Sequence, residues 1–332
     1  MQLSCIIYLG WCCTSSALNR PHLPEHKQGD STVKKVVISG LLVLFLSIAQ
    51  IALAGPLKVF VSILPQKYFV EKIGGDFVEV AVMVQPGASP ATYEPKPKQM
   101  VALAKSDIYF AIGVPFEKTW LPKIVATNPK MHIVYTQVGI EKRAMKSHHA
   151  HQEEAKHHYG ETEHGQDHHL GKDPHVWLSP PLVMQQARNI LNGLETLDPT
   201  HRALYQANYK SFIVELVDLD LELKRLFQTT ADHSEFMVFH PSWGYFAHAY
   251  GLEQVPIEIE GKELKPAELK YLIQYGKQIG IEVIFVQPQF SWQTARTIAQ
   301  ATTAQIVVVD PLAPDWAENL RQVAAKLSTA LR

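Results

Sequence analysis

Two series of short strands and helices, one on each side of a long amphipathic stretch, constrain the fold of this 332-residue chain more than any other feature. In both series, apolar and β-branched runs alternate with segments of helical periodicity. The predicted strands are 57–63, 78–84, 107–113 and 131–136 in the first series, and 236–239, 255–259, 282–287 and 306–309 in the second. Strands that alternate with helices imply βαβ units and parallel sheets. We therefore expect an α/β protein with two parallel-sheet lobes.

The stretch between the two series predicts two helices. They begin at Ser179-Pro180 and Asp198-Pro199, because each pair offers an N-cap residue and a proline at the first helical position. The second helix extends to about Gln228, and its apolar side chains share one face at an alternating 4-3 spacing: Tyr205, Tyr209, Phe212, Leu216, Leu219, Leu223 and Leu226. That face could form the seam of a coiled-coil dimer, or it could pack against both lobes as a spine. The α/β sequence on either side favours the spine.

Residues 1–54 have the features of a leader and signal peptide that is removed on export. Lys34-Lys35 precede an apolar run at 36–49, and Ala52-Leu53-Ala54 predicts cleavage after Ala54. Because a signal peptide normally begins its protein, we expect translation to start near Val33. The remaining predicted boundaries are an N-terminal lobe at 55–197 with a histidine-rich loop at 146–172, a linking long helix at 198–229 and a C-terminal lobe at 230–332.

The composition limits which compartment and which classes of partner we expect for this chain. The three cysteines lie in the predicted leader, so the exported part has no thiol for a disulfide, a thiolate metal site or a nucleophile. The formal net charge is −1 without a basic patch, which argues against nucleic acid as a partner. A second hydrophobic span is not apparent, so we expect no stable membrane insertion after cleavage. The chain is predicted to be a periplasmic monomer.

A histidine-rich tract precedes the middle helices. Its histidines are His148, His149, His151, His157, His158, His164, His168 and His169. Imidazole is a common ligand of transition metals, and tracts of this composition are typical of metal binding. The tract has few apolar residues to offset its ordering entropy, so a mobile loop is expected. A solvating linker is the alternative, although a linker would need only polarity and not histidine in particular.

Three further residues predict a metal site. His175 follows the loop, while His240 and Asp310 each end a predicted strand. Ligands of parallel sheets bind beyond the carboxyl ends of the strands, so the residues at these places are candidate ligands. A lone histidine at a strand end is more often structural, but three such residues beside a histidine-rich loop favour metal. Nitrogen and oxygen ligands without thiolate favour Zn²⁺, with Mn²⁺ or Fe²⁺ as less favoured ions.

Several separate motifs occur in an order that resembles the metal-binding solute-binding proteins of zinc and manganese ABC importers. They are Gly87-Ala88-Ser89-Pro90 with Tyr93-Glu94-Pro95, Asp173-Pro174-His175-Val176-Trp177-Leu178-Ser179-Pro180, Phe239-His240-Pro241-Ser242-Trp243-Gly244-Tyr245-Phe246, Glu260-Gly261-Lys262-Glu263 and Val309-Asp310-Pro311-Leu312. The resemblance implies two α/β lobes joined by a single long helix, with the metal site in the cleft between the lobes. It also implies that a histidine-rich loop marks a zinc-specific member.

One departure from the family pattern affects the expected ligands. The family usually places a histidine just before Thr-Tyr-Glu-Pro, and this chain has Ala91 there. The resemblance therefore transfers only His175, His240 and Asp310. The fourth position could be filled by water, by a loop histidine, or by a nearby side chain, for which the candidates are Glu94, Glu260 and Gln289.

These observations predict capture of periplasmic Zn²⁺, as transported ligand, and its delivery to the membrane permease of an ABC importer. The permease and its ATPase must be separate chains, because no Gly-x-x-x-x-Gly-Lys-Ser/Thr phosphate-binding loop is present. Two alternatives stay open. One is a zinc hydrolase that activates water at an open coordination position with Glu260 as base, although no His-Glu-x-x-His motif occurs. The other is a metal buffer or chaperone that works through the histidine loop. We expect no catalytic residues.

Overall fold

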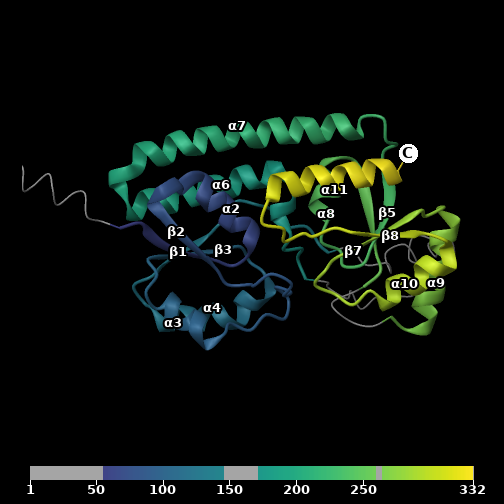
Figure 1. Cartoon of the computed structure of the whole chain (residues 1–332), viewed down its shortest axis with the longest axis horizontal. Coiled ribbons are helices and arrows are strands. Elements are labelled where there is room, and N and C mark those ends of the chain that lie inside the picture. Colours follow the sequence, from purple (N-terminus) through teal and green to yellow (C-terminus); the bar gives the residue numbers. More distant parts are fainter. Residues whose placement is uncertain (1–54, 146–170, 259–263, 332) are drawn as a thin grey trace, which may run out of the picture. The chain divides into compact units, whose positions relative to one another are not determined.

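The computed structural model describes residues 55–145, 171–258 and 264–331, and within it Gly55–Arg332 form one compact unit. Two four-stranded parallel sheets organise these residues (Figure 1). The first has the order β2-β1-β3-β4, and the second has the order β6-β5-β7-β8. The strands of the first sheet are β1 (Leu57–Val61), β2 (Val78–Val82), β3 (Ile108–Ala111) and β4 (His132–Tyr135). Those of the second are β5 (Ser234–Val238), β6 (Leu252–Pro256), β7 (Val283–Val286) and β8 (Gln305–Val308).

Helices follow the strands in both lobes, so the expected α/β fold with two parallel sheets is confirmed. In the first lobe they are α2 (Leu64–Gly74), α3 (Pro97–Leu103) and α4 (Pro115–Thr127). The middle of the chain forms α6 (Pro180–Leu197) and α7 (Arg202–Phe227), and the second lobe contains α8 (Gly244–Ala249), α9 (Pro266–Gln278), α10 (Gln293–Thr302) and α11 (Trp316–Ala330). Among the described helices, none combines the length and apolar character needed to cross a membrane.

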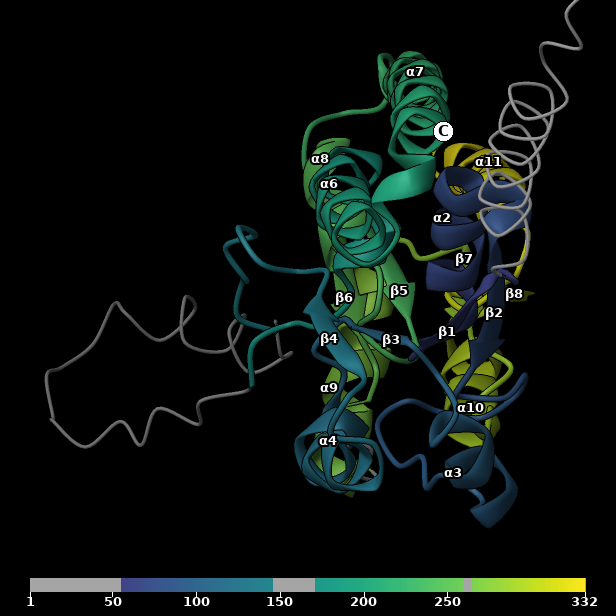
Figure 2. The same ribbon diagram turned by 90° about the vertical axis from the view of Figure 1, so that its left-hand side faces the viewer.

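Helix α7 is the predicted spine. A single 3₁₀ turn at Pro199–His201 precedes it, so the α-helix begins three residues later than the proline signal predicts. The predicted apolar face is confirmed: five of its members are buried and the other two pack against the core. The face contacts α2 and α6 of the first lobe and α11 of the second, which Figures 1 and 2 show from two sides. Because these side chains are buried within the chain, the coiled-coil interpretation is wrong.

Besides the start of α7, one element lies three residues from its predicted range. Strand β6 begins at Leu252, opposite Ser234 of β5, and ends before Ile257. Its early residues include the polar pair Glu253-Gln254, which concealed the strand in the sequence. Helix α11 begins at Trp316, six residues after Asp310, and local hydrogen bonds hold the backbone between them. Leu312 donates to the Asp310 carboxylate, and Trp316 N–H donates to the carbonyl of Pro314.

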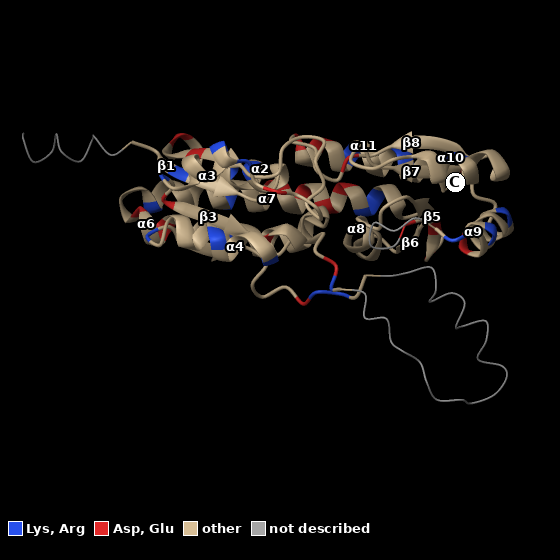
Figure 3. Ribbon diagram, turned by 90° about the horizontal axis from the view of Figure 1, so that it is seen from below, with Lys and Arg blue, Asp and Glu red and all other residues tan. Residues whose placement is uncertain are grey.

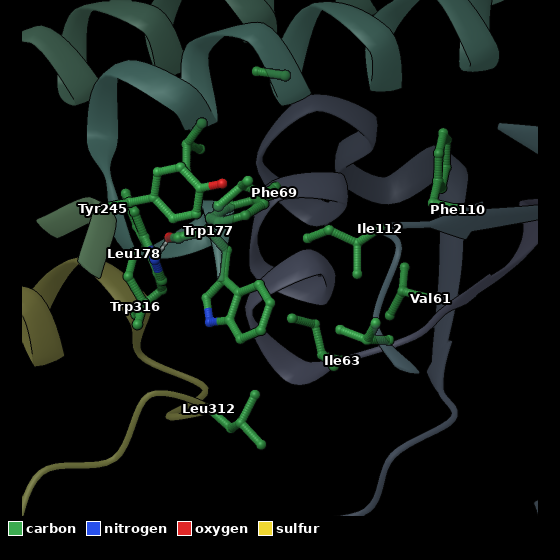
Figure 4. Close-up of a cluster of buried hydrophobic side chains, with 14 of the residues drawn as sticks. Val61, Ile63, Phe69, Phe110, Ile112, Trp177, Leu178, Tyr245, Leu312 and Trp316 are labelled. Carbon is green, nitrogen blue, oxygen red and sulfur yellow. Dashed lines mark hydrogen bonds between the residues drawn. The ribbon is translucent and has the colours of Figure 1, made fainter. Parts of the chain in front are cut away.

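One apolar core runs between the two sheets, and two tryptophans lie at its centre (Figure 4). Trp177 Nε1 donates to the carbonyl of Pro311 at 2.7 Å, and Trp316 Nε1 donates to the carbonyl of Trp177 at 2.7 Å. The Trp316 ring also packs edge-to-face on Phe69 of α2, with 5.0 Å between ring centroids. The start of α11 and the loop after β8 are thus attached to the turn before α6 and to α2 of the first lobe.

Candidate metal centre

His175 and His240 face each other across the junction of the two sheets. His175 precedes the 3₁₀ turn Val176–Leu178, and His240 follows β5. Their Nε2 atoms lie 3.4 Å apart, and their rings are inclined at 74°. Two nitrogens bound to one tetrahedral zinc ion at about 2.0–2.1 Å each are separated by about 3.3–3.4 Å. The spacing of the pair therefore fits one edge of a tetrahedral zinc site.

Each histidine of this pair is backed by a buried carboxylate. His175 Nδ1 lies 2.7 Å from Asp173 Oδ1, and His240 Nδ1 lies 2.7 Å from Glu258 Oε2. A carboxylate accepts hydrogen bonds, so each Nδ1 carries the proton and each Nε2 directs its lone pair at the other ring. Burial lowers the pKa of His175 below its ordinary value, while the Asp173 charge opposes that shift. The pair is thus arranged to accept a cation between its two Nε2 atoms.

Backbone pairing fixes His175. Asp173 N–H donates to the carbonyl of Arg143 at 2.8 Å, and Ala144 forms an antiparallel bridge with Lys172. We call these two short segments, 143–145 and 171–173, the clasp. Asp173 Oδ1 also accepts from the backbone N–H of His175 at 2.9 Å. The carboxylate that orients the imidazole therefore also shapes the turn that carries it.

A buried glutamine and an aromatic ring fix His240. The Gln287 side chain accepts from the His240 N–H at 3.0 Å and donates to the His240 carbonyl at 2.9 Å. The imidazole stacks on Phe290, with 4.7 Å between centroids and 25° between planes. Both contacts come from the segment after β7, so the neighbouring parallel strand positions the ligand that ends β5.

Asp310 occupies the segment after β8. Its Oδ1 accepts from Gln289 Nε2 at 2.7 Å and from the backbone N–H of Leu312 at 2.9 Å. Asp310 and Gln289 line a cavity of about 160 Å³ together with Leu64 and residues 84–87 of the first lobe. In the described ranges, no three His, Cys, Asp or Glu side chains are grouped closely enough to hold an ion. The structure thus brings two predicted ligands together, and Asp310 as the third stays a prediction.

Of the other candidate positions, three are described by the structure and the rest are not. Ala91 and Glu94 are exposed, and the Ala91 N–H donates to Ser89 Oγ at 3.2 Å. Gln289 is half-buried and contacts Asp310. Glu260 and the eight loop histidines lie outside the described residues.

Sequence reasoning did not identify Asp173 and Glu258 as hydrogen-bond partners of the predicted ligands His175 and His240. Asp173 stands two positions before His175 in a motif already recognised, and Glu258 ends the segment after β6. Because metal-binding histidines almost always donate their second ring nitrogen to a carboxylate or carbonyl, a search for acidic residues near each histidine in the sequence could have found Asp173 but not Glu258, which lies 18 residues from His240.

Charged residues of both signs occur throughout the described part of the chain. Figure 3 shows acidic and basic residues of both signs spread over the helices.

Comparison with known proteins places these observations in context. A family model described as zinc-uptake complex component A, periplasmic (ZnuA), matches residues 59–330. The high-affinity zinc uptake system protein ZnuA of Bacillus subtilis is 31% identical over 261 residues, which cover 77% of this chain and 78% of that protein. The chain spans about half the length of the zinc-binding AdcA proteins of Streptococcus that it also matches.

Solved structures agree with the fold. A crystal structure of ZnuA has a TM-score of 0.75 at 41% identity and covers 83% of this chain and 100% of that chain. A ZnuA deletion mutant with zinc bound has a TM-score of 0.74 at 40% identity and covers 83% of this chain and 98% of that chain.

Proposed function

This chain belongs to the family of periplasmic zinc-uptake components, and we propose that it captures one Zn²⁺ ion between its two lobes and delivers the ion to the permease of an ABC importer. The observation that carries this proposal is the histidine pair. His175 and His240 present their Nε2 atoms to each other at 3.4 Å, and each has a carboxylate on its other nitrogen. That arrangement matches the ligand spacing and the outer hydrogen bonds of a zinc site.

The chemistry of capture follows from charge and burial. Zn²⁺ takes the lone pairs of both Nε2 atoms, which lie 3.4 Å apart, while the protons stay on the Nδ1 atoms. Asp173 and Glu258 lie close behind the imidazoles and offset the charge of a dication in this poorly solvated site. Asp310 contributes an anionic oxygen as the third protein ligand. In this proposal, capture and release of the ion form and break only coordination bonds, so the site suits a carrier.

The partners and compartment follow from the same proposal. The permease and its ATPase are separate chains, and the carrier acts in the periplasm as a monomer after removal of its leader at Ala54. The eight loop histidines act as accessory ligands that raise the local zinc concentration. The hydrolase alternative requires Glu260 as a base, and this residue lies outside the described residues.

Calorimetric zinc titration of the exported chain and two histidine variants tests the proposal. We expect one tight binding event in the wild type, and we expect His240→Ala to lose it. His132→Ala is the matched control, because His132 lies exposed on β4 and should leave the tight event unchanged. Equal affinity of His240→Ala and the wild type would refute the interlobe site. Loss of tight binding on deletion of residues 148–169 would instead favour the histidine-loop buffer.

A further inference from the structure

We propose that the amide oxygen of Gln289 completes the coordination of the captured ion, in the position that Ala91 leaves without a ligand. This inference rests on the proposed function and assigns a residue to its one open position. Four observations carry it: an unpartnered oxygen, its orientation relative to Asp310, its place in a cavity between the lobes, and its link to the histidine pair.

Only one of the two polar atoms of the Gln289 side chain forms a hydrogen bond within the described residues. Its Nε2 donates to Asp310 Oδ1 at 2.7 Å, while its Oε1 is buried and has no hydrogen-bond partner in the described part of the chain. A buried carbonyl oxygen without a partner costs free energy, so native proteins keep few of them and usually at functional positions. The oxygen of Gln289 is therefore available to a cation or to a donor that enters the site.

The hydrogen bond to Asp310 fixes the orientation of the Gln289 side-chain amide. A carboxylate oxygen can only accept, so the nitrogen of Gln289 must face Asp310 and the oxygen must face away. The same hydrogen bond occupies Oδ1 of Asp310, which already accepts from the Leu312 N–H, and leaves Oδ2 for an ion. The two side chains thus offer one anionic and one neutral oxygen that are held together before any ion arrives.

The cavity of about 160 Å³ is lined by residues of both lobes. Gln289 and Asp310 form its wall in the second lobe, and residues 84–87 form part of its wall in the first lobe. Residues 84–87 open the same loop that carries Ala91, where the family usually has a histidine. A cavity of this size accommodates an ion with a water molecule. An oxygen ligand from the second lobe can therefore replace a nitrogen ligand from the first.

Two contacts connect this cavity to the histidine pair. Phe290, the neighbour of Gln289, stacks on His240, and the carbonyl of Pro311, the neighbour of Asp310, accepts from Trp177 two residues beyond His175. The four side chains thus come from segments in direct contact. Among the other candidates, Ala91 has no donor atom and Glu94 is exposed.

The proposed donor set is two nitrogens and two oxygens, from His175, His240, Asp310 and Gln289. An amide carbonyl is a harder ligand than imidazole and suits Mn²⁺ better than a third histidine does. The chain should therefore discriminate less strongly between zinc and manganese than its own Ala91→His variant. Gln289 then determines selectivity as well as affinity.

A double-mutant cycle tests the assignment. Zinc dissociation constants are measured by competition with a chromophoric chelator for the wild type, Gln289→Leu, Ala91→His and the double variant. We expect Gln289→Leu to weaken zinc binding about tenfold in the wild-type background, and less than about threefold in the Ala91→His background, where imidazole takes the position. Equal losses in both backgrounds, or no loss in the wild type, would overturn the proposal.

A second variant separates coordination from support of Asp310. Gln289→Glu keeps an oxygen but removes the hydrogen bond that the amide donates to Asp310. If Gln289 is a ligand, Gln289→Glu retains tight zinc binding and the tetrahedral visible spectrum of bound Co²⁺. If Gln289 only positions Asp310, Gln289→Glu weakens binding as much as Gln289→Leu does. The comparison of Gln289→Glu with Gln289→Leu distinguishes the two roles of Gln289 even if the new imidazole of Ala91→His does not reach the site.

Two controls complete the design. Thermal unfolding of each metal-free variant shows whether the fold is intact. Absence of tight zinc binding in the wild type would contradict the proposed function itself. Tight binding that depends on His240 but not on Gln289 would overturn only the present inference.

Discussion

At the scale of single residues, two carboxylates decide what the histidine pair can bind. Asp173 is 3% exposed and Glu258 is 4% exposed, so their charges act on the imidazoles with little screening by water. Each holds a proton on Nδ1 and thereby keeps Nε2 free as a metal ligand. The selectivity of the pair for a cation thus depends on residues that do not touch the ion.

Asp173→Asn tests this dependence. Asparagine keeps an oxygen that can accept from the His175 N–H, but it removes the charge that compensates the ion. We expect zinc affinity to fall about tenfold, measured by chelator competition at pH 7. Asp220→Asn is the matched control, because Asp220 is also a buried carboxylate but bonds Lys224 and Tyr250 on the far side of the chain. Wild-type affinity in Asp173→Asn would contradict the argument.

The sequence predicted His175 because it follows the histidine-rich loop, and His240 because it ends a predicted strand. It could not reveal the carboxylate behind His240, since Glu258 reaches His240 only through the pairing of β5 with β6. It also could not reveal how Asp310 is held, because the Gln289 hydrogen bond depends on two loops after different strands. Residue type and strand position predict candidate ligands, whereas side-chain direction decides their partners.

At the scale of elements, helix α8 connects the two ligand-bearing segments. It begins four residues after His240 and presents the Tyr245 hydroxyl to the clasp. That hydroxyl accepts from the Arg143 N–H at 3.0 Å and donates to the Asp173 carbonyl at 3.1 Å. The helix of one lobe therefore holds the segment that positions His175.

Tyr245→Phe should remove this connection and change the dependence of stability on pH. Burial raises the pKa of Tyr245 to about 12, against an unfolded value of about 10. The folded state favours the neutral phenol, so this contribution is fully present below pH 10 and is lost as the pH rises through 12. At pH 8 the variant should be less stable by about 1–2 kcal/mol from the lost hydrogen bonds, and the difference should narrow at pH 11.

Denaturant unfolding at both pH values checks this expectation, and a constant difference would contradict it. Tyr250→Phe provides the comparison for function. Its hydroxyl donates to Asp220 rather than to the clasp, and burial raises its pKa as well. Both variants should therefore show the alkaline effect, but only Tyr245→Phe should weaken zinc binding.

Element prediction succeeded where periodicity was strong and failed where polar residues entered a strand. The 4-3 spacing on α7 predicted its buried face because long helices show their pattern over several turns. Strand β6 was placed too late because Gln254 is polar but buried. Its side chain accepts from the Trp243 N–H and donates to the Pro241 carbonyl, so tertiary hydrogen bonds satisfy it inside the core.

At the scale of the whole described unit, the two sheets share one core. Buried residues of both lobes belong to the same apolar cluster, which includes the tryptophan contacts between α11 and the first lobe. A smaller cluster covers the opposite face of the second sheet. Because the shared core cannot be exposed in one lobe without exposing apolar surface of the other, the lobes should not unfold independently.

The metal-free chain is therefore expected to unfold in a single transition. Far-ultraviolet circular dichroism and tryptophan fluorescence, followed through the same urea titration, should give coincident curves. Trp316→Phe should lower stability by about 2–3 kcal/mol, because it removes the hydrogen bond to the Trp177 carbonyl and part of the buried ring. Trp292→Phe is the matched control, since its Nε1 donates to Gln287 within the second lobe alone and its ring is half-buried. Two separated transitions in the wild type would mean that the lobes fold independently, and the site between them would then be assembled by the ion rather than held ready for it.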